Sequence, residues 1–133
     1  NKPFAKAGDS NGGFAWLSRD KLEVGKYIAD PYCGAILTAD GLRGMFNGLS
    51  RSTQQANIAS INKNTPVLII SGEDDPVHNK GRGIKALVER YKNADIKVTT
   101  KIYPAGRHEM FNETNREEVY ADLLYWLTEI EYD

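Results

Sequence analysis

The sequence is poor in the features that cross-link a protein or attract it to charged polymers. It has one cysteine, Cys33, so neither an internal disulfide nor a cluster of thiol ligands can form. Its 17 Lys and Arg and 18 Asp and Glu are mixed along the chain, and the net charge of −1 leaves no basic stripe for nucleic acid or an anionic membrane. No apolar run approaches the roughly 18 residues of a membrane span, and no charged-then-apolar leader stands at the start. We therefore expect a soluble, cytoplasmic protein without nucleic-acid or membrane partners.

The 133 residues suffice for one domain, and 41% of them are hydrophobic, as is ordinary for a globular protein. Residues 1–13 contain three glycines and a proline without sustained apolar periodicity, which is typical of a linker. The rest divides into a helical part, 14–62, and a part in which strands and helices alternate, 63–133.

Two amphipathic helices are predicted in the helical part. In the first, Ser18 is the expected N-cap, Leu17 and Leu22 form a hydrophobic staple, and Asp30-Pro31 ends the helix. The second begins near Thr38 and extends to about residue 61. Its apolar residues have the spacing of one helix face and are Leu42, Met45, Phe46 and Leu49. Because two such helices make a poor core alone, we expect them to lie on another surface.

The second part has the pattern strand, helix, strand, helix, which predicts a βαβα unit with a right-handed crossover. Residues 67–70 are apolar on both faces, as in a strand buried between helix layers, whereas 97–103 alternate and are expected nearer a sheet edge. A capping box at Thr114–Glu117 is the expected start of the last helix. The apolar faces of the two helices are Ile84, Leu87, Val88 and Tyr91, and Val119, Leu123, Trp126, Leu127 and Ile130.

Two strands are too few for a doubly wound sheet. The first strand would leave an apolar edge unpaired, which natural proteins cover because such an edge promotes aggregation. We expect more sheet to be supplied by missing sequence or by another chain, a homo-oligomer being one such arrangement.

Each predicted strand leads into a loop with one titratable residue well placed for chemistry. Asp75 is held extended just past the first strand by Pro76, and His108 follows the second strand after Pro104-Ala-Gly106. Loops at the carboxyl ends of parallel strands leave the same sheet edge, so the two side chains can meet as the acid and base of a catalytic triad. Two plainer interpretations stay open: the acidic loop caps the next helix, or His108 is an ordinary surface histidine.

The nucleophile that such a pair requires is not evident. Ser10 lies in Gly8-Asp-Ser-Asn-Gly12, which matches G-x-S-x-G, and the order Ser10, Asp75, His108 is that of the hydrolases. However, a nucleophile elbow needs a buried strand before it and a helix after it, and neither is predicted there. We interpret Ser10 as part of a flexible turn.

Metal and nucleotide sites are not predicted. His108-Glu109 lacks the second histidine of a zinc-binding helix, and a turn holding Asp74, Asp75 and His78 is more typical of a polar loop than of a cation site. Gly81-Arg-Gly83 lacks the further glycine and the lysine of a phosphate-binding loop.

Three stretches together resemble the C-terminal portion of an α/β-hydrolase of the monoacylglycerol lipase, lysophospholipase and serine aminopeptidase type. Residues 14–34 resemble the start of the cap inserted between core strands in bacterial members. Residues 65–77 resemble the strand and loop that present the catalytic acid, and 103–127 resemble the histidine loop and last helix.

The resemblance implies an α/β fold in which a helical cap, 14–62, precedes the βαβα end of a mostly parallel sheet, 63–133. It places the first strands, the nucleophile and the oxyanion hole outside this sequence. It also implies hydrolysis of a carboxylic ester through a serine acyl-enzyme, with Asp75 and His108 as acid and base and with no cofactor. Lysophospholipid or monoacylglycerol is the favoured substrate class, and short esters or an N-terminal peptide bond are alternatives. The chain alone is expected to be inactive; the competing interpretation is a truncated, non-catalytic hydrolase fragment that serves as a binding or assembly module.

Overall fold

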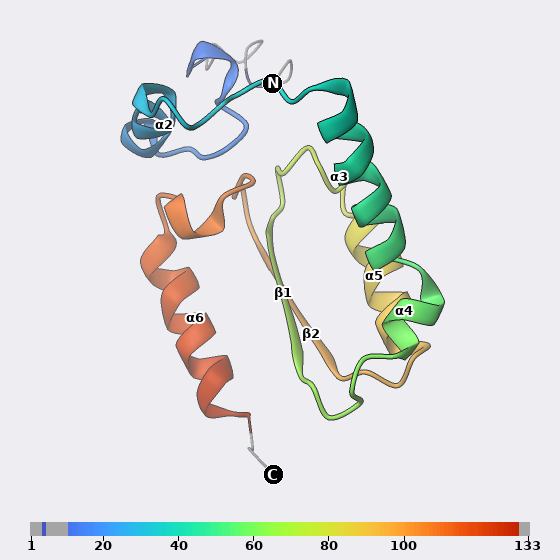
Figure 1. Cartoon of the computed structure of the whole chain (residues 1–133). Coiled ribbons are helices and arrows are strands. Elements are labelled where there is room, and N and C mark those ends of the chain that lie inside the picture. Colours follow the sequence, from blue (N-terminus) through green and yellow to red (C-terminus); the bar gives the residue numbers. More distant parts are fainter. Residues whose placement is uncertain (1–3, 5–10, 131–133) are drawn as a thin grey trace.

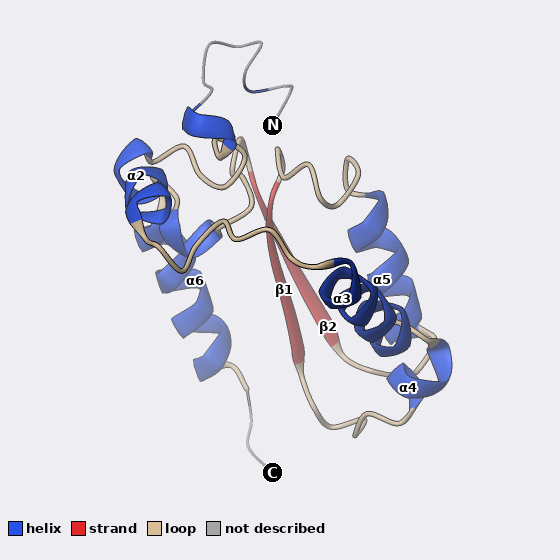
Figure 2. Ribbon diagram, turned by 45° about the horizontal axis from the view of Figure 1, so that its top comes forward, coloured by secondary structure: helices blue, strands red, loops and turns tan. Residues whose placement is uncertain are grey.

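The computed structural model describes residue 4 and residues 11–130, and Ser10 with most of the predicted linker lies outside these residues. Two parallel strands run between helices on either side, with α6 on one side and α3 and α5 on the other (Figures 1 and 2). In chain order the elements are η1 (Asn11–Gly13), α2 (Lys21–Ala29), α3 (Ala39–Ser52), α4 (Gln55–Ala59), β1 (Val67–Gly72), α5 (Arg82–Lys92), β2 (Val98–Tyr103), η2 (Met110–Asn112) and α6 (Arg116–Thr128).

The strands β1 and β2 pair in parallel, as the sequence predicts, with α5 as the connection. Their register runs from Val67 opposite Val98 to Gly72 opposite Tyr103. The strand β1 is longer than the predicted 67–70 and reaches full burial only at its last two residues. Among the described residues β2 is its one neighbour, so the apolar residues of the 67–70 segment are half-buried rather than enclosed.

Two small cores stabilise the opposite ends of this sheet. One joins α4, the start of β1 and the segment before β2, and it consists of Ile58, Ala94 and Ile96 with Ile61, Val67 and Tyr91 around them. The other joins the ends of both strands to η2 and α6, and it consists of Tyr103, Met110 and Val119 with Ile70. The second core therefore fixes the carboxyl ends of the strands, where the loops of Asp75 and His108 begin.

The prediction that Ser18 caps the first helix is wrong. The N-cap of α2 is Asp20, whose carboxylate accepts hydrogen bonds from the N–H groups of Leu22 and Glu23. The Ser18 hydroxyl instead donates to the distant carbonyl of Asn112. The predicted staple is also absent, because Leu17 is buried while Leu22 is 78% exposed. Ser18 thus donates to a tertiary partner and accepts from the N–H of Asp20, rather than from the first N–H groups of the helix.

The prediction of a capping box at Thr114–Glu117 is likewise wrong. The N-cap of α6 is Asn115, one residue after the predicted Thr114, and its side chain forms no capping hydrogen bond. The backbone N–H of Thr114 donates to the buried carboxylate of Glu113, so this residue serves the loop rather than the helix. In the helical part, Thr38 does cap α3 as expected, accepting from the N–H of Gly41. The helix predicted to reach residue 61 is broken at Thr53, and α4 ends at Ala59.

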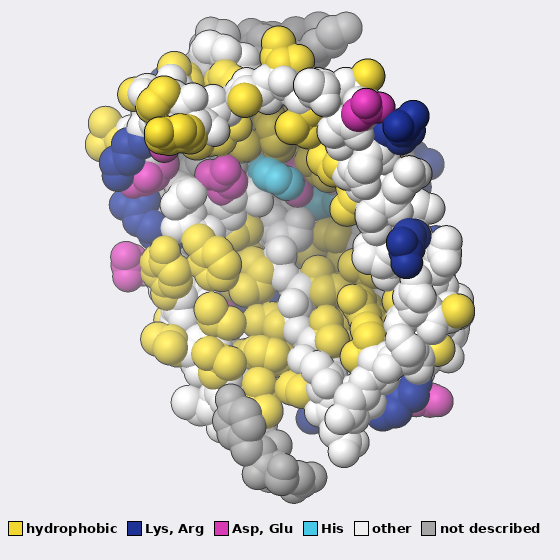
Figure 3. All heavy atoms as spheres, in the orientation of Figure 1, with side chains coloured by type: hydrophobic (Ala, Val, Ile, Leu, Met, Phe, Trp, Pro, Cys, Tyr) yellow, Lys and Arg dark blue, Asp and Glu magenta, His cyan; other side chains and the backbone are white. Residues whose placement is uncertain are grey.

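Hydrophobic side chains gather on one face of the molecule, over β1 and the facing sides of α3 and α6 (Figure 3). On α3 no residue is buried. Its predicted apolar face is exposed by 40 to 60% and comprises Leu42, Met45, Phe46 and Leu49. None of the helices in the described part of the chain is long and apolar enough to cross a membrane.

Candidate active site

The acidic loop after β1 presents one buried carboxylate. Asp75 is 8% exposed, and its Oδ1 accepts a hydrogen bond of 2.9 Å from the N–H of Val77, across Pro76. The N–H of Asp75 donates to the carbonyl of Gly72, the last residue of β1. The loop therefore turns tightly and fixes Oδ2 at the carboxyl edge of the sheet.

The histidine loop after β2 brings His108 to this carboxylate. The Nδ1 of His108 lies 3.0 Å from the Oδ2 of Asp75, although 33 residues separate the two. Since an ionised carboxylate only accepts, the imidazole is assigned a proton on Nδ1, and Nε2 carries the free lone pair. No other described residue forms a hydrogen bond to Nε2. This arrangement is one that can work as the orienting acid and the base of a triad.

A close approach of two glycines holds the loops together. A Cβ atom on Gly72 would lie 2.1 Å from the carbonyl carbon of Gly106, so only glycine fits there. Backbone hydrogen bonds cross the same gap, from the N–H of Asp74 to Gly106 and from the N–H of Glu73 to Tyr103. The distance between acid and base is therefore set by backbone contact as well as by their own hydrogen bond.

A segment from the helical part supports the histidine from its other side. The N–H of His108 donates to the carbonyl of Trp16 and the N–H of Glu109 donates to that of Leu17. The indole ring of Trp16 also lies against the imidazole, with ring centroids 4.8 Å apart. About 90 residues separate these groups in sequence, and no local pattern marks their contact.

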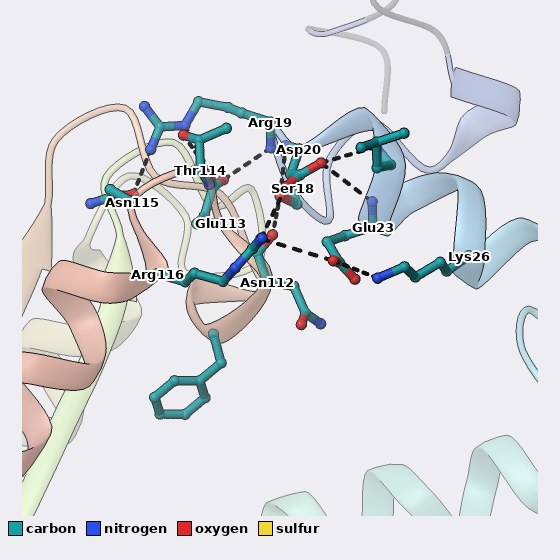
Figure 4. Close-up of polar contacts among 12 residues, drawn as sticks. Ser18, Arg19, Asp20, Glu23, Lys26, Asn112, Glu113, Thr114, Asn115 and Arg116 are labelled. Carbon is teal, nitrogen blue, oxygen red and sulfur yellow. Dashed lines mark hydrogen bonds and ion pairs between the residues drawn. The ribbon is translucent and has the colours of Figure 1, made fainter.

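Behind the histidine loop lies a fully buried carboxylate, that of Glu113 (Figure 4). Burial raises its pKa, but hydrogen bonds from the Arg19 side chain and from three backbone N–H groups more than offset this, and the pKa lies below its usual range. Glu113 is therefore a carboxylate at neutral pH. No local sequence pattern marks Glu113 as part of a site.

The second histidine, His78, stabilises the loop in which it lies. His78 donates from Nε2 to the carbonyl of Gly72 and accepts from the N–H of Gly81 at Nδ1, both at 2.8 Å. Both ring nitrogens are thus occupied within the loop. Among residues 4 and 11–130, no group of three His, Cys, Asp or Glu side chains could hold a metal ion.

A hollow beside the sheet is not lined by Asp75 or His108. It has a volume of about 650 Å³ and lies between α5 and β2, against Ile84, Val88 and Ile102. A hollow of about 500 Å³ borders Asp75 but not His108. Neither of these two hollows is lined by His108.

The sequence profile of a known family, described as "Serine aminopeptidase, S33", matches residues 3–115. The chain belongs to this family. A monoacylglycerol lipase of Mycolicibacterium smegmatis is 32% identical over 114 residues, which are 84% of this chain and 38% of the lipase.

Two solved structures that resemble the chain extend the family assignment to the fold. A thermostable carboxyl esterase from Bacillus coagulans, solved with glycerol, has a TM-score of 0.74 at 25% identity and covers 86% of this chain. A lipase in an open form has a TM-score of 0.77 at 26% identity and covers 87%. This chain spans 38% of the length of each of them. It therefore has part of the α/β-hydrolase fold of the esterases and lipases.

Proposed function

We propose that this chain supplies the acid and the base of the catalytic triad in a carboxylic ester hydrolase. The observation that carries the proposal is the hydrogen bond between Asp75 and His108, at the joined carboxyl ends of two parallel strands. A serine in the remainder of the family fold would attack the ester carbonyl. We call the polypeptide that contains both parts the whole enzyme.

In this mechanism the Nε2 atom of His108 removes the proton of the serine as the serine attacks. The tetrahedral intermediate collapses to an acyl-enzyme, and His108 gives the same proton to the departing alcohol. Water then repeats the sequence and releases the acid. Asp75 keeps the proton of the neutral imidazole on Nδ1 and stabilises the imidazolium that forms in each step.

The substrate class that we propose is an acyl ester such as monoacylglycerol or lysophospholipid. Support comes from the monoacylglycerol lipase relative and from the esterase and lipase of similar fold. The exposed apolar side of α3, which includes Met45 and Phe46, suits an acyl chain. The same side chains would equally serve to hold a cap on the core.

We further propose the division into a cap at 14–62 and a core at 63–133. The contacts of Trp16 and Leu17 with the histidine loop are consistent with a cap whose first residues lie directly on the catalytic edge.

A fluorophosphonate probe, which reacts with activated serines, tests the proposed reaction. The whole enzyme should be labelled at one serine, whereas the isolated 133-residue chain should not be labelled at all. Robust labelling of the isolated chain that disappears in Ser10→Ala would identify Ser10 as the nucleophile and contradict our interpretation of that residue. Absence of labelling in a folded whole enzyme would favour the non-catalytic binding or assembly module.

The free edge of β1 is the proposed docking position for more of the sheet, from the remainder of the enzyme or from another chain. In the isolated chain this edge and the apolar face over it would meet water, at a cost of roughly 25 cal/mol per Å² of apolar surface. We expect the isolated chain to self-associate or to retain a bound partner at micromolar concentration. Sedimentation velocity that shows a compact monomer throughout this range would contradict the expected docking edge.

A further inference from the structure

The carboxylate of Glu113 holds two segments that are far apart in sequence. Its Oε1 accepts hydrogen bonds from the N–H of Arg107, at 2.9 Å, and from the N–H of Arg19, at 3.1 Å. Its Oε2 accepts from the Nε of Arg19, at 2.8 Å, and from the N–H of Thr114, at 3.0 Å. Figure 4 shows Glu113 next to Arg19 and Thr114. One side chain thus joins the segment before α2 to the loop that carries His108.

The contact with Arg107 is significant because Arg107 immediately precedes His108. Three successive N–H groups of the loop are held in this way: that of Arg107 by Glu113, and those of His108 and Glu109 by the carbonyls of Trp16 and Leu17. The two carbonyls belong to the segment that Glu113 binds through Arg19. The backbone beneath the imidazole is therefore fixed on both sides by the same carboxylate.

The His108 imidazole needs support from its backbone because few interactions of the side chain itself hold it. Its side chain is 37% exposed, and its contacts are one hydrogen bond to Asp75 and the ring of Trp16. A base must be held within a few tenths of an ångström and about 10–20° of its working geometry. Since the His108 side chain is partly exposed, the hydrogen bonds of its backbone contribute to that precision.

Packing alone does not explain why a charged side chain, that of Glu113, is buried behind the histidine loop. A buried carboxylate is costly to desolvate, and an apolar side chain of similar volume is often as stable as a buried ion pair. An apolar side chain would, however, leave the N–H groups of Arg107, Arg19 and Thr114 without the acceptor that Glu113 provides.

We propose that Glu113 is a positioning residue for His108, which fixes the catalytic imidazole through the backbone of its loop and through Arg19. The inference rests on the proposed function. Glu113 touches neither reacting atoms nor Asp75; it acts only on the segments that orient the base.

The test compares Glu113→Gln with Asp122→Asn in the whole enzyme. Asp122 is a matched control because it also accepts from a cation, Lys101, and from a buried donor, Tyr103, but through side chains and not through the backbone of the histidine loop. For Glu113→Gln we expect kcat to fall by about 10- to 100-fold with little change in KM, the size of effect that misplacing a catalytic group produces. The downfield proton resonance of the His108 Nδ1–H should also broaden or disappear. Asp122→Asn should keep both kcat and the resonance.

The inference is overturned if Glu113→Gln loses stability to the same extent as Asp122→Asn while keeping kcat and the resonance. Should Glu113→Gln fail to fold, Arg19→Lys provides the same test. It keeps the charge, but one ammonium cannot reproduce the contacts of Arg19 with Glu113 and Asn115 together. A loss of kcat in Arg19→Lys that is smaller than the 10- to 100-fold expected for Glu113→Gln supports the inference. An unchanged kcat in Arg19→Lys contradicts it. If the wild-type enzyme hydrolyses no ester, the proposed reaction fails, and the Nδ1–H resonance alone still decides whether Glu113 positions His108.

Discussion

Replacement of His108 by alanine should lower kcat for ester hydrolysis in the whole enzyme by about 10⁴-fold or more, with the fold retained. With Nδ1 bound to Asp75, the Nε2 atom is the base that the site offers to a nucleophile. Alanine removes this base, and no other described histidine is available, since His78 uses both its nitrogens within its own loop. The His108 side chain is 37% exposed, but its loss leaves the Oδ2 of the buried Asp75 without this partner, so we expect a loss of about 1–3 kcal/mol in stability.

The matched control is His78→Gln, because its amide can still donate to the carbonyl of Gly72. We expect this variant to keep kcat within the same order as the wild type, even if it is less stable. The rate of fluorophosphonate labelling should follow kcat in both variants, which separates loss of the base from loss of substrate binding. Labelling of His108→Ala at the wild-type rate would show that another group activates the serine.

The strand ends and the two catalytic candidates could be predicted from the sequence because they depend on local patterns. An apolar run specifies β1 and an alternating pattern specifies β2, and the parallel pairing of neighbouring strands places their following loops at one edge. Asp75 and His108 were therefore expected to lie near each other, and the structure places them 3.0 Å apart.

The support around the histidine could not be predicted, because it depends on partners more than 90 residues away. Ser18 has the local features of an N-cap, yet its hydroxyl donates to Asn112. Glu113 has the appearance of a solvated loop residue, yet Arg19 makes its complete burial possible. In both cases a tertiary hydrogen bond outweighs a local preference, which is worth about 1 kcal/mol for a helix cap. Half-burial of β1 has a different cause, since β2 is its one neighbour among the described residues.

Gly72→Ala should destabilise the protein by about 3 kcal/mol or more and separate the acid from the base. Its Cβ would lie 2.1 Å from the carbonyl carbon and 2.2 Å from the carbonyl oxygen of Gly106. These are backbone atoms, so no rotamer change relieves the overlap and the two loops must move apart. The hydrogen bond from Asp74 to Gly106 and that between Asp75 and His108 span the same gap and should both weaken. Urea unfolding and kcat measure the two effects independently.

Gly48→Ala is the matched control, because a Cβ at Gly48 meets no atom within 4 Å. This glycine lies inside α3, where alanine is the better helix former by up to about 1 kcal/mol. The same substitution should therefore be neutral or stabilising in α3 and strongly destabilising at the end of β1. If Gly72→Ala instead unfolds at the wild-type urea concentration and keeps its activity, the contact of Gly72 with Gly106 cannot be what sets the distance between Asp75 and His108.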